Sequence, residues 1–87
     1  MIYDVQFTHR ASKEFLGLPA EIRDRVTERI DALRLEPRPP GCVTIQGLKG
    51  AYRLRVGDYR VVYVLEDATY RVSVVRIGHR REVYRNL

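Results

Sequence analysis

The chain has 87 residues, of which 45% are hydrophobic, and a formal net charge of +5 at pH 7. A chain of this length supports one domain with a modest core, and its hydrophobic fraction excludes general disorder. The sequence contains no run of about 18 apolar residues, and its first residues, MIYDVQF, do not resemble a secretory signal. We therefore expect a cytoplasmic protein with no membrane partner. A lone cysteine, Cys42, excludes an internal disulfide.

The basic residues are concentrated in the second half of the sequence. Sixteen Lys and Arg face eleven Asp and Glu, and this excess favours a polyanionic partner. Nine of the sixteen follow residue 46: Lys49, Arg53, Arg55, Arg60, Arg71, Arg76, Arg80, Arg81 and Arg85. The C-terminal half is therefore expected to carry the functional surface.

The first half predicts one strand followed by two helices. Apolar and polar residues alternate over residues 2–7, which is the period of a strand. Thr8 can cap a short helix from His9 to about Gly17. A second helix is expected from Pro19, with an apolar stripe toward a sheet at Ile22, Val26, Ile30 and Leu33. The mixed charges on the rest of this helix are interpreted as a solvated face.

The second half predicts three strands. The proline-rich residues 36–41 form a connector, and residues 42–50 are left mostly as loop. Strand patterns then cover residues 51–56, 59–66 and 70–77, separated by turn signals. The expected fold is α+β: an N-terminal strand, a two-helix hairpin and a three-stranded antiparallel meander, with the helices packed on one face of the sheet. We expect residues 1–87 to form a single domain.

The first hairpin places like charges together. A two-residue turn at Gly57-Asp58 pairs Arg55 with Arg60 and Arg53 with Val62, so the three arginines share one face. Like charges directly opposite each other destabilise a sheet, and a bound anion such as phosphate would relieve the conflict.

The second hairpin admits more than one register, because several loop lengths fit Asp67-Ala68-Thr69. A three-residue loop pairs Glu66 with Tyr70 and brings Arg76 opposite Arg60. Two sets of apolar residues then divide between the faces. Those expected to meet the helices are Tyr52, Leu54, Val61 and Tyr63, and those expected under the basic face are Val62, Val64, Val72 and Val74.

The segment from Gly78 to Tyr84 brings further polar groups to the end of the last strand. Histidine is the side-chain type whose ordinary pKa lies nearest neutrality, which makes His79 a candidate for proton transfer. Tyr84 offers an aromatic surface and a phenol. Cleavage of RNA without a metal needs a base for the ribose 2′-hydroxyl, cations for the phosphorane charge and an acid for the leaving oxygen. From the residues alone, a nucleic-acid role, an anionic protein partner and an ordinary solvated surface all remain open.

Two stretches, GLKGAYRLRVGDYRVVYVL (47–65) and RIGHRREVY (76–84), resemble the RelE/ParE toxin superfamily and in particular its RelE-type branch. The expected order of strands and helices resembles it as well. The resemblance implies an mRNA interferase of a type II toxin–antitoxin system, which enters the ribosomal A site and cuts mRNA by attack of the 2′-hydroxyl. It implies no metal and no cofactor. The expected partners are a cognate antitoxin, which would form a hetero-oligomer with the toxin, and the mRNA in the ribosome.

The site candidates divide into two sets. The catalytic candidates are Arg60, His79, Arg80 and Tyr84, and the candidates for binding RNA phosphate are Lys49, Arg53, Arg55, Arg76 and Arg81. Many RelE-type members have lysines where this chain has Arg53 and Arg55, and arginine is a poor base. Our hypothesis is that His79 or Tyr84 handles protons while the arginines bind phosphate.

Two alternatives come from other classes of protein. A ParE-like toxin would share the scaffold but inhibit DNA gyrase and need no nuclease site. A non-enzymatic module would use the basic sheet only to dock an acidic partner.

Overall fold

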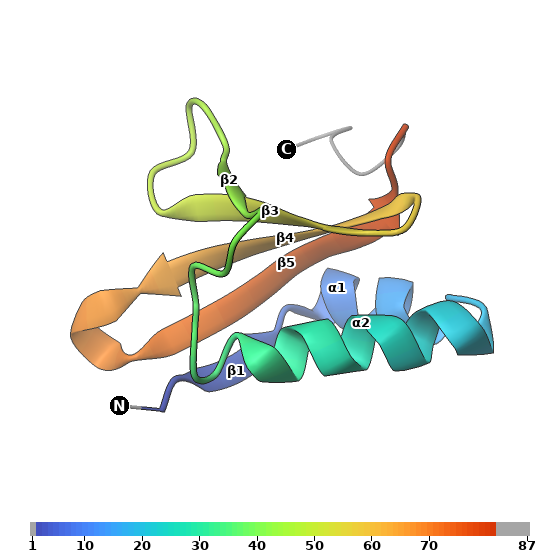
Figure 1. Cartoon of the computed structure of the whole chain (residues 1–87), viewed down its shortest axis with the longest axis horizontal. Coiled ribbons are helices and arrows are strands. Elements are labelled where there is room, and N and C mark those ends of the chain that lie inside the picture. The colour runs from blue at the N-terminus through green and yellow to red at the C-terminus, as the bar shows by residue number, and fades with distance from the viewer. Residues whose placement is uncertain (1, 82–87) are drawn as a thin grey trace.

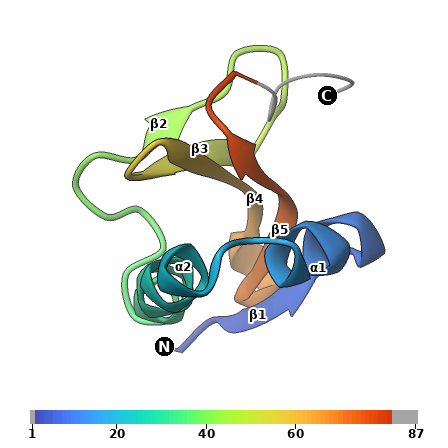
Figure 2. The same ribbon diagram turned by 90° about the vertical axis from the view of Figure 1, so that its right-hand side faces the viewer.

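Five strands form one sheet, and both helices pack on the same face of it (Figures 1 and 2). The computed structural model describes residues 2–81. Its elements are β1 (Asp4–Phe7), α1 (His9–Leu16), α2 (Ala20–Ala32), β2 (Val43–Thr44), β3 (Ala51–Val56), β4 (Tyr59–Glu66), a 3-10 turn (Asp67–Thr69) and β5 (Arg71–His79). The predicted α+β class, with the helices on one face, is confirmed.

The strand order across the sheet is β1-β5-β4-β3-β2. Strand β1 runs parallel to β5, and the other neighbours are antiparallel. The sheet is therefore the predicted meander extended by one strand at each side. The loop prediction for residues 42–50 was wrong at Val43–Thr44, which pair with Arg53 and Tyr52. Two residues are too few to show an alternation of polar and apolar side chains.

Both helices begin and pack as the sequence predicts. The Thr8 side chain caps α1 by accepting a hydrogen bond from the Ala11 backbone nitrogen at 3.1 Å. On α2, Val26 and Ile30 are buried against the sheet. The main cluster of buried residues lies between the two layers and includes Leu33, Leu54, Val61, Tyr63 and Ile77. Each such side chain stabilises the fold by roughly 1.5–3 kcal/mol relative to leaving it exposed.

A polar cluster holds the connector after α2 against the sheet. Arg38 donates to both carboxylate oxygens of Asp67, the nearer at 2.7 Å, and its Nε donates to the Tyr52 hydroxyl at 2.8 Å. The Tyr3 hydroxyl also donates to Asp67, at 2.7 Å. The hydrogen bond from Arg38, followed by that from Tyr3, lowers the pKa of Asp67, and the bond to Asp67 raises the pKa of Tyr3. One carboxylate thus ties together the N-terminal strand, the connector and the turn before β5.

A β-bulge in β5 decides which side chains reach each face of the sheet. Tyr63 pairs with Val74 and Val62 pairs with Arg76, so Val75 has no partner on β4. As predicted, Leu54, Val61 and Tyr63 belong to the core on the helix side. The placement of Val72 and Val74 under the basic face was wrong, because both are fully buried in that same core. The turn before β5 is longer than expected and pairs Glu66 with Arg71, which reverses the faces of these two valines.

Candidate functional site

Three arginines share the sheet face that the helices leave open. Arg55 lies opposite Arg60 and Arg53 lies opposite Val62, so the register predicted for this hairpin is confirmed. The turn works because Gly57 has a φ of +60°, a conformation that glycine adopts without strain. Arg53 and Arg60 are partly buried, whereas Arg55 is exposed. We call Arg53, Arg55 and Arg60 the sheet arginines.

Arg76 reaches the same face through the bulge. Arg60 pairs with Gly78, and Arg76 pairs with Val62, so the predicted Arg60–Arg76 pairing was wrong. The extra residue, Val75, turns Arg76 away from the helix side, where Val74 points. Arg53, Val62 and Arg76 consequently form one row across β3, β4 and β5.

Arg76 is nevertheless buried, with only 6% of its surface exposed. Its Nε donates to Glu14 Oε2 at 3.2 Å, and Glu14 Oε1 accepts a hydrogen bond from the Ile77 backbone nitrogen at 2.9 Å. Strand β1 pairs with β5 only as far as Val74. Beyond that residue, the Glu14 carboxylate from α1 accepts the hydrogen bond of the β5 backbone at Ile77. Arg76 therefore belongs to an ion pair that joins α1 to the sheet.

Lys49 lies beside an apolar depression next to this face. The depression has a volume of about 410 Å³ and is lined mainly by aliphatic side chains, together with the cations Arg10 from α1, Lys49 from the loop before β3 and Arg76 from β5. Its residues are Thr8, Arg10, Leu48, Lys49, Ala51, Val62, Val64, Val75 and Arg76. Arg10 was not a sequence candidate, and nothing in the helix pattern of residues 9–17 marks it.

His79 does not join the sheet arginines. It pairs with Tyr59, and the two rings meet edge to face at 5.8 Å on the helix side of the sheet. Its Nδ1 accepts a hydrogen bond from the Arg81 backbone nitrogen at 3.4 Å. Strand β5 continues to His79, so the alternation of side chains sends this ring to the face opposite Arg60. With Tyr59, Glu14 and the residues between α1 and α2, it lines a hollow of about 290 Å³.

The remaining candidates follow the last strand. Arg80 and Arg81 are exposed, and the Arg80 backbone nitrogen donates to the Asp58 carbonyl oxygen at 2.9 Å. This bond holds Arg80, which directly follows β5, beside the β3–β4 turn. Arg80 therefore lies at the same end of the sheet as Arg55 and Arg60. Tyr84 lies outside the described residues.

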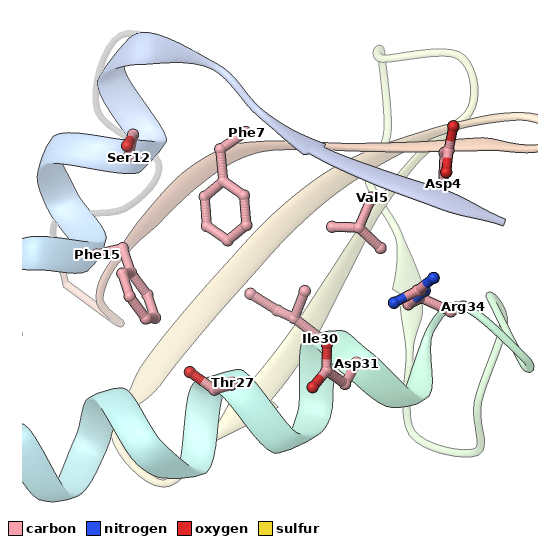
Figure 3. A pocket seen from close by; sticks show the side chains of 9 residues that line it. All are labelled: Asp4, Val5, Phe7, Ser12, Phe15, Thr27, Ile30, Asp31 and Arg34. Carbon is pink, nitrogen blue, oxygen red and sulfur yellow. The ribbon is translucent and has the colours of Figure 1, made fainter.

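A separate cavity of about 480 Å³ lies between β1, α1 and α2 (Figure 3). Apolar groups such as Val5, Phe7 and Ile30 line it together with Asp31 and Arg34. It contains none of the sequence-predicted site residues. Over residues 2–81, no group of His, Cys, Asp and Glu side chains is placed to hold a metal ion. None of the helices within this range is long and apolar enough to cross a membrane.

Several solved structures with the same fold are complexes of a toxin with its antitoxin. The toxin–antitoxin complex RelBE2 of Mycobacterium tuberculosis matches with a TM-score of 0.80 and 30% identity, covering 92% of this chain and 100% of the matched chain. The archaeal RelE–RelB complex of Pyrococcus horikoshii matches with a TM-score of 0.82 and 27% identity, covering 95% and 100%. The fold is that of toxins from type II toxin–antitoxin systems.

Sequence comparison identifies the family. The profile of the family described as ParE toxin of type II toxin–antitoxin system matches residues 5–84. Toxin RelG of Mycobacterium tuberculosis is 34% identical over 86 residues, which is 98% of this chain and 99% of the relative. The mRNA interferase toxin RelE of Escherichia coli K12 is 31% identical over 88 residues, covering 97% of this chain and 92% of the relative. The chain belongs to the RelE/ParE toxin superfamily and is a toxin of a type II toxin–antitoxin system.

Proposed function

We propose that this toxin is a cytoplasmic endoribonuclease that cuts mRNA in the ribosomal A site. Cleavage would proceed by attack of a ribose 2′-hydroxyl on the adjacent phosphate. The observation that carries the proposal is the set of sheet arginines on the open face, where Arg55 and Arg60 oppose each other directly. Like charges in register destabilise a sheet, and an anion between them removes that penalty. The relatives named mRNA interferase support RNA as that anion.

The arginines supply binding and charge stabilisation. Guanidinium groups hold phosphate through paired hydrogen bonds and stay charged at any physiological pH. We assign RNA phosphate to Arg53, Arg55 and Lys49, and the developing phosphorane charge to Arg60. The Arg80 backbone nitrogen bonds to Asp58 in the β3–β4 turn, just before Arg60, and we assign Arg80 and Arg81 the RNA backbone beside the cleaved phosphate.

Arg76 takes a positioning role in this proposal, in place of direct phosphate binding. Its ion pair with Glu14 and its burial fix the end of β5 relative to α1. Arg60 pairs with Gly78, two residues further along the same strand. A rigid β5 therefore keeps Arg60 in its place opposite Arg55.

Two side chains, His79 and Tyr84, are the candidates for proton transfer. A role for His79 requires its ring to leave Tyr59 and reach the other face of the sheet, and we therefore assign the larger share of proton transfer to Tyr84. Replacing Tyr84 with Phe should then slow cleavage more than replacing His79 with Gln. The reverse order would return the assignment to His79.

A cognate antitoxin is the proposed protein partner, in a hetero-oligomeric complex. Several solved structures of similar toxins are complexes with an antitoxin, which supports this proposal. The antitoxin would neutralise the sheet arginines and keep RNA from them.

Induction of the chain without its antitoxin, followed by mapping of mRNA 5′ ends, tests the proposed function. We expect cuts at a fixed position within codons, and in a reconstituted translation system these cuts should need ribosomes. Arg60→Ala should lower the cleavage rate by roughly 100-fold, as loss of one preorganised donor does in other enzymes. Arg23→Ala, which removes a charge from α2, is the matched control and should leave cleavage unchanged.

A gyrase-directed activity is the alternative that one observation favours, because the matching family profile carries the ParE name. In that case induction would cause DNA breaks and leave mRNA intact. The wild-type chain and Arg60→Ala would be equally toxic. Growth without any toxicity would instead favour a non-enzymatic binding module.

A further inference from the structure

Three guanidinium groups surround the β3–β4 turn, away from the centre of the sheet face. Arg29 on α2 donates from Nη1 to the Arg55 carbonyl oxygen at 3.2 Å, and the Arg55 Nε donates to the Gly57 carbonyl oxygen at 3.1 Å. Arg25 lies over Gly57, where an added β-carbon would meet its Nη1 at 3.6 Å. Figure 1 shows this turn above the N-terminal half of α2. We call Arg25, Arg29 and Arg55 the turn cluster.

Capping of the turn carbonyls does not account for this arrangement. A guanidinium group has five N–H donors, and the hydrogen bonds to the turn use one each from Arg29 and Arg55. Among residues 2–81, no carboxylate lies within 4 Å of any member of the turn cluster, although Asp58 belongs to the same turn. Three permanent positive charges therefore converge with most of their donors unused by the described part of the chain.

The way α2 packs on the sheet places Arg25 and Arg29 beside the turn. Arg25 and Arg29 are four residues apart and lie on one flank of the helix. Thr27 lies on the other flank and Arg34 follows the end of the helix, and both line the cavity beside β1 (Figure 3). Arg23 precedes Thr27 by four residues and shares its side of the helix. The positive charge of α2 is thus divided between two flanks, and one of them meets the hairpin.

We propose that the turn cluster binds the phosphate backbone of folded RNA, as a second contact outside the face that binds the cleaved strand. Arg55 belongs both to the sheet arginines and to the turn cluster, so the guanidinium groups continue from Arg53 and Arg60 around the turn to α2. A polyanion longer than the sheet face would follow this line. The inference extends the proposed RNA function by naming a surface that grips RNA without cutting it.

The test measures binding of the purified chain to a labelled 2′-O-methyl RNA hairpin, which cannot be cut by 2′-hydroxyl attack. Affinity is followed as a function of salt concentration. Each phosphate contact contributes roughly one unit to the slope of log K against log salt. The double variant Arg25→Ala/Arg29→Ala should lower the magnitude of the slope by about 2. Arg23→Ala/Arg34→Ala removes the same charge from the side of α2 and its following residues that faces away from the turn, and should keep the wild-type slope.

Each outcome decides the proposal. Equal slopes for the two double variants and the wild-type chain would overturn it. An unchanged slope combined with weaker binding of the antitoxin would also overturn it, and would assign the turn cluster to an acidic protein segment. Arg25→Lys/Arg29→Lys keeps the charge and should restore most of the slope, which separates lost contacts from misfolding. If mRNA mapping finds no cleavage but the slope still falls by about 2, the proposed nuclease fails and the RNA contact stands.

Discussion

Replacing Arg55 with Gln should stabilise the fold at low salt while it weakens RNA cleavage. Arg55 lies directly opposite Arg60, and β-carbons at such positions are about 4.5–5.5 Å apart. Two unit charges at roughly 6 Å in water repel by about 0.7 kcal/mol. For a domain of this size, that gain corresponds to a rise of about 3–5 °C in Tm. The hydrogen bond from Arg55 to Gly57 is exposed, and water can replace it.

Arg71→Gln is the matched control for this prediction. Arg71 occupies the same kind of position on β5 but lies opposite Glu66, an acidic residue. Its loss should therefore lower stability at low salt. Thermal melts at low and at high salt measure both changes, and both should shrink as salt screens the charges. If Arg55→Gln lowers Tm at low salt, or if the two variants respond to salt with the same sign, the reasoning from cross-strand charge is refuted.

Two further predictions concern the contacts that position the site. Glu14→Gln removes an ion-pair partner of the buried Arg76 and should destabilise the fold by about 3 kcal/mol, which a urea titration would detect; a change within experimental error would show that this ion pair does not contribute to stability. The hydrogen bonds from Arg38 and Tyr3 lower the pKa of Asp67 in the folded state. The ionised carboxylate therefore stabilises the fold above about pH 4, and this stabilisation is lost as the pH falls through the folded-state pKa. Asp67→Asn should therefore be less stable than the wild-type chain at neutral pH, and the difference should narrow in acid; a constant difference from pH 7 to pH 2 would contradict this assignment.

The sequence predicts the first hairpin well and the second poorly, for a physical reason. A two-residue turn with glycine at a positive φ leaves one register, so the placement of Arg53, Arg55 and Arg60 follows from the turn alone. The second turn allows several lengths, and the bulge at Val75 shifts the register again within the strand. Nothing in a run of β-branched residues marks which of them will lack a partner.

The candidate site was predictable only in part, because it depends on tertiary placement. His79 and Arg80 are neighbours in sequence, yet His79 packs on Tyr59 on the helix side. Glu14 and Arg29 looked like ordinary surface residues of helices. The i, i+4 spacing of Arg25 and Arg29 beside the apolar stripe of α2 was a visible signal, but only the packing of α2 against the hairpin gives it meaning.

The order of the strands carries a consequence for how this protein is made. Strand β5, the last strand along the described chain, lies between β1 and β4 and is the only strand that pairs with β1. A nascent chain in which only residues 1–66 have left the ribosome holds β1 and both helices but has no strand on which β1 can dock. Strand β1 pairs with Arg71–Val74 of β5, so the two parts can join only after that stretch has left the exit tunnel, and pairing over such sequence separations is slow. The complete five-stranded sheet, and with it the full basic face, therefore forms only after β5 has been synthesised.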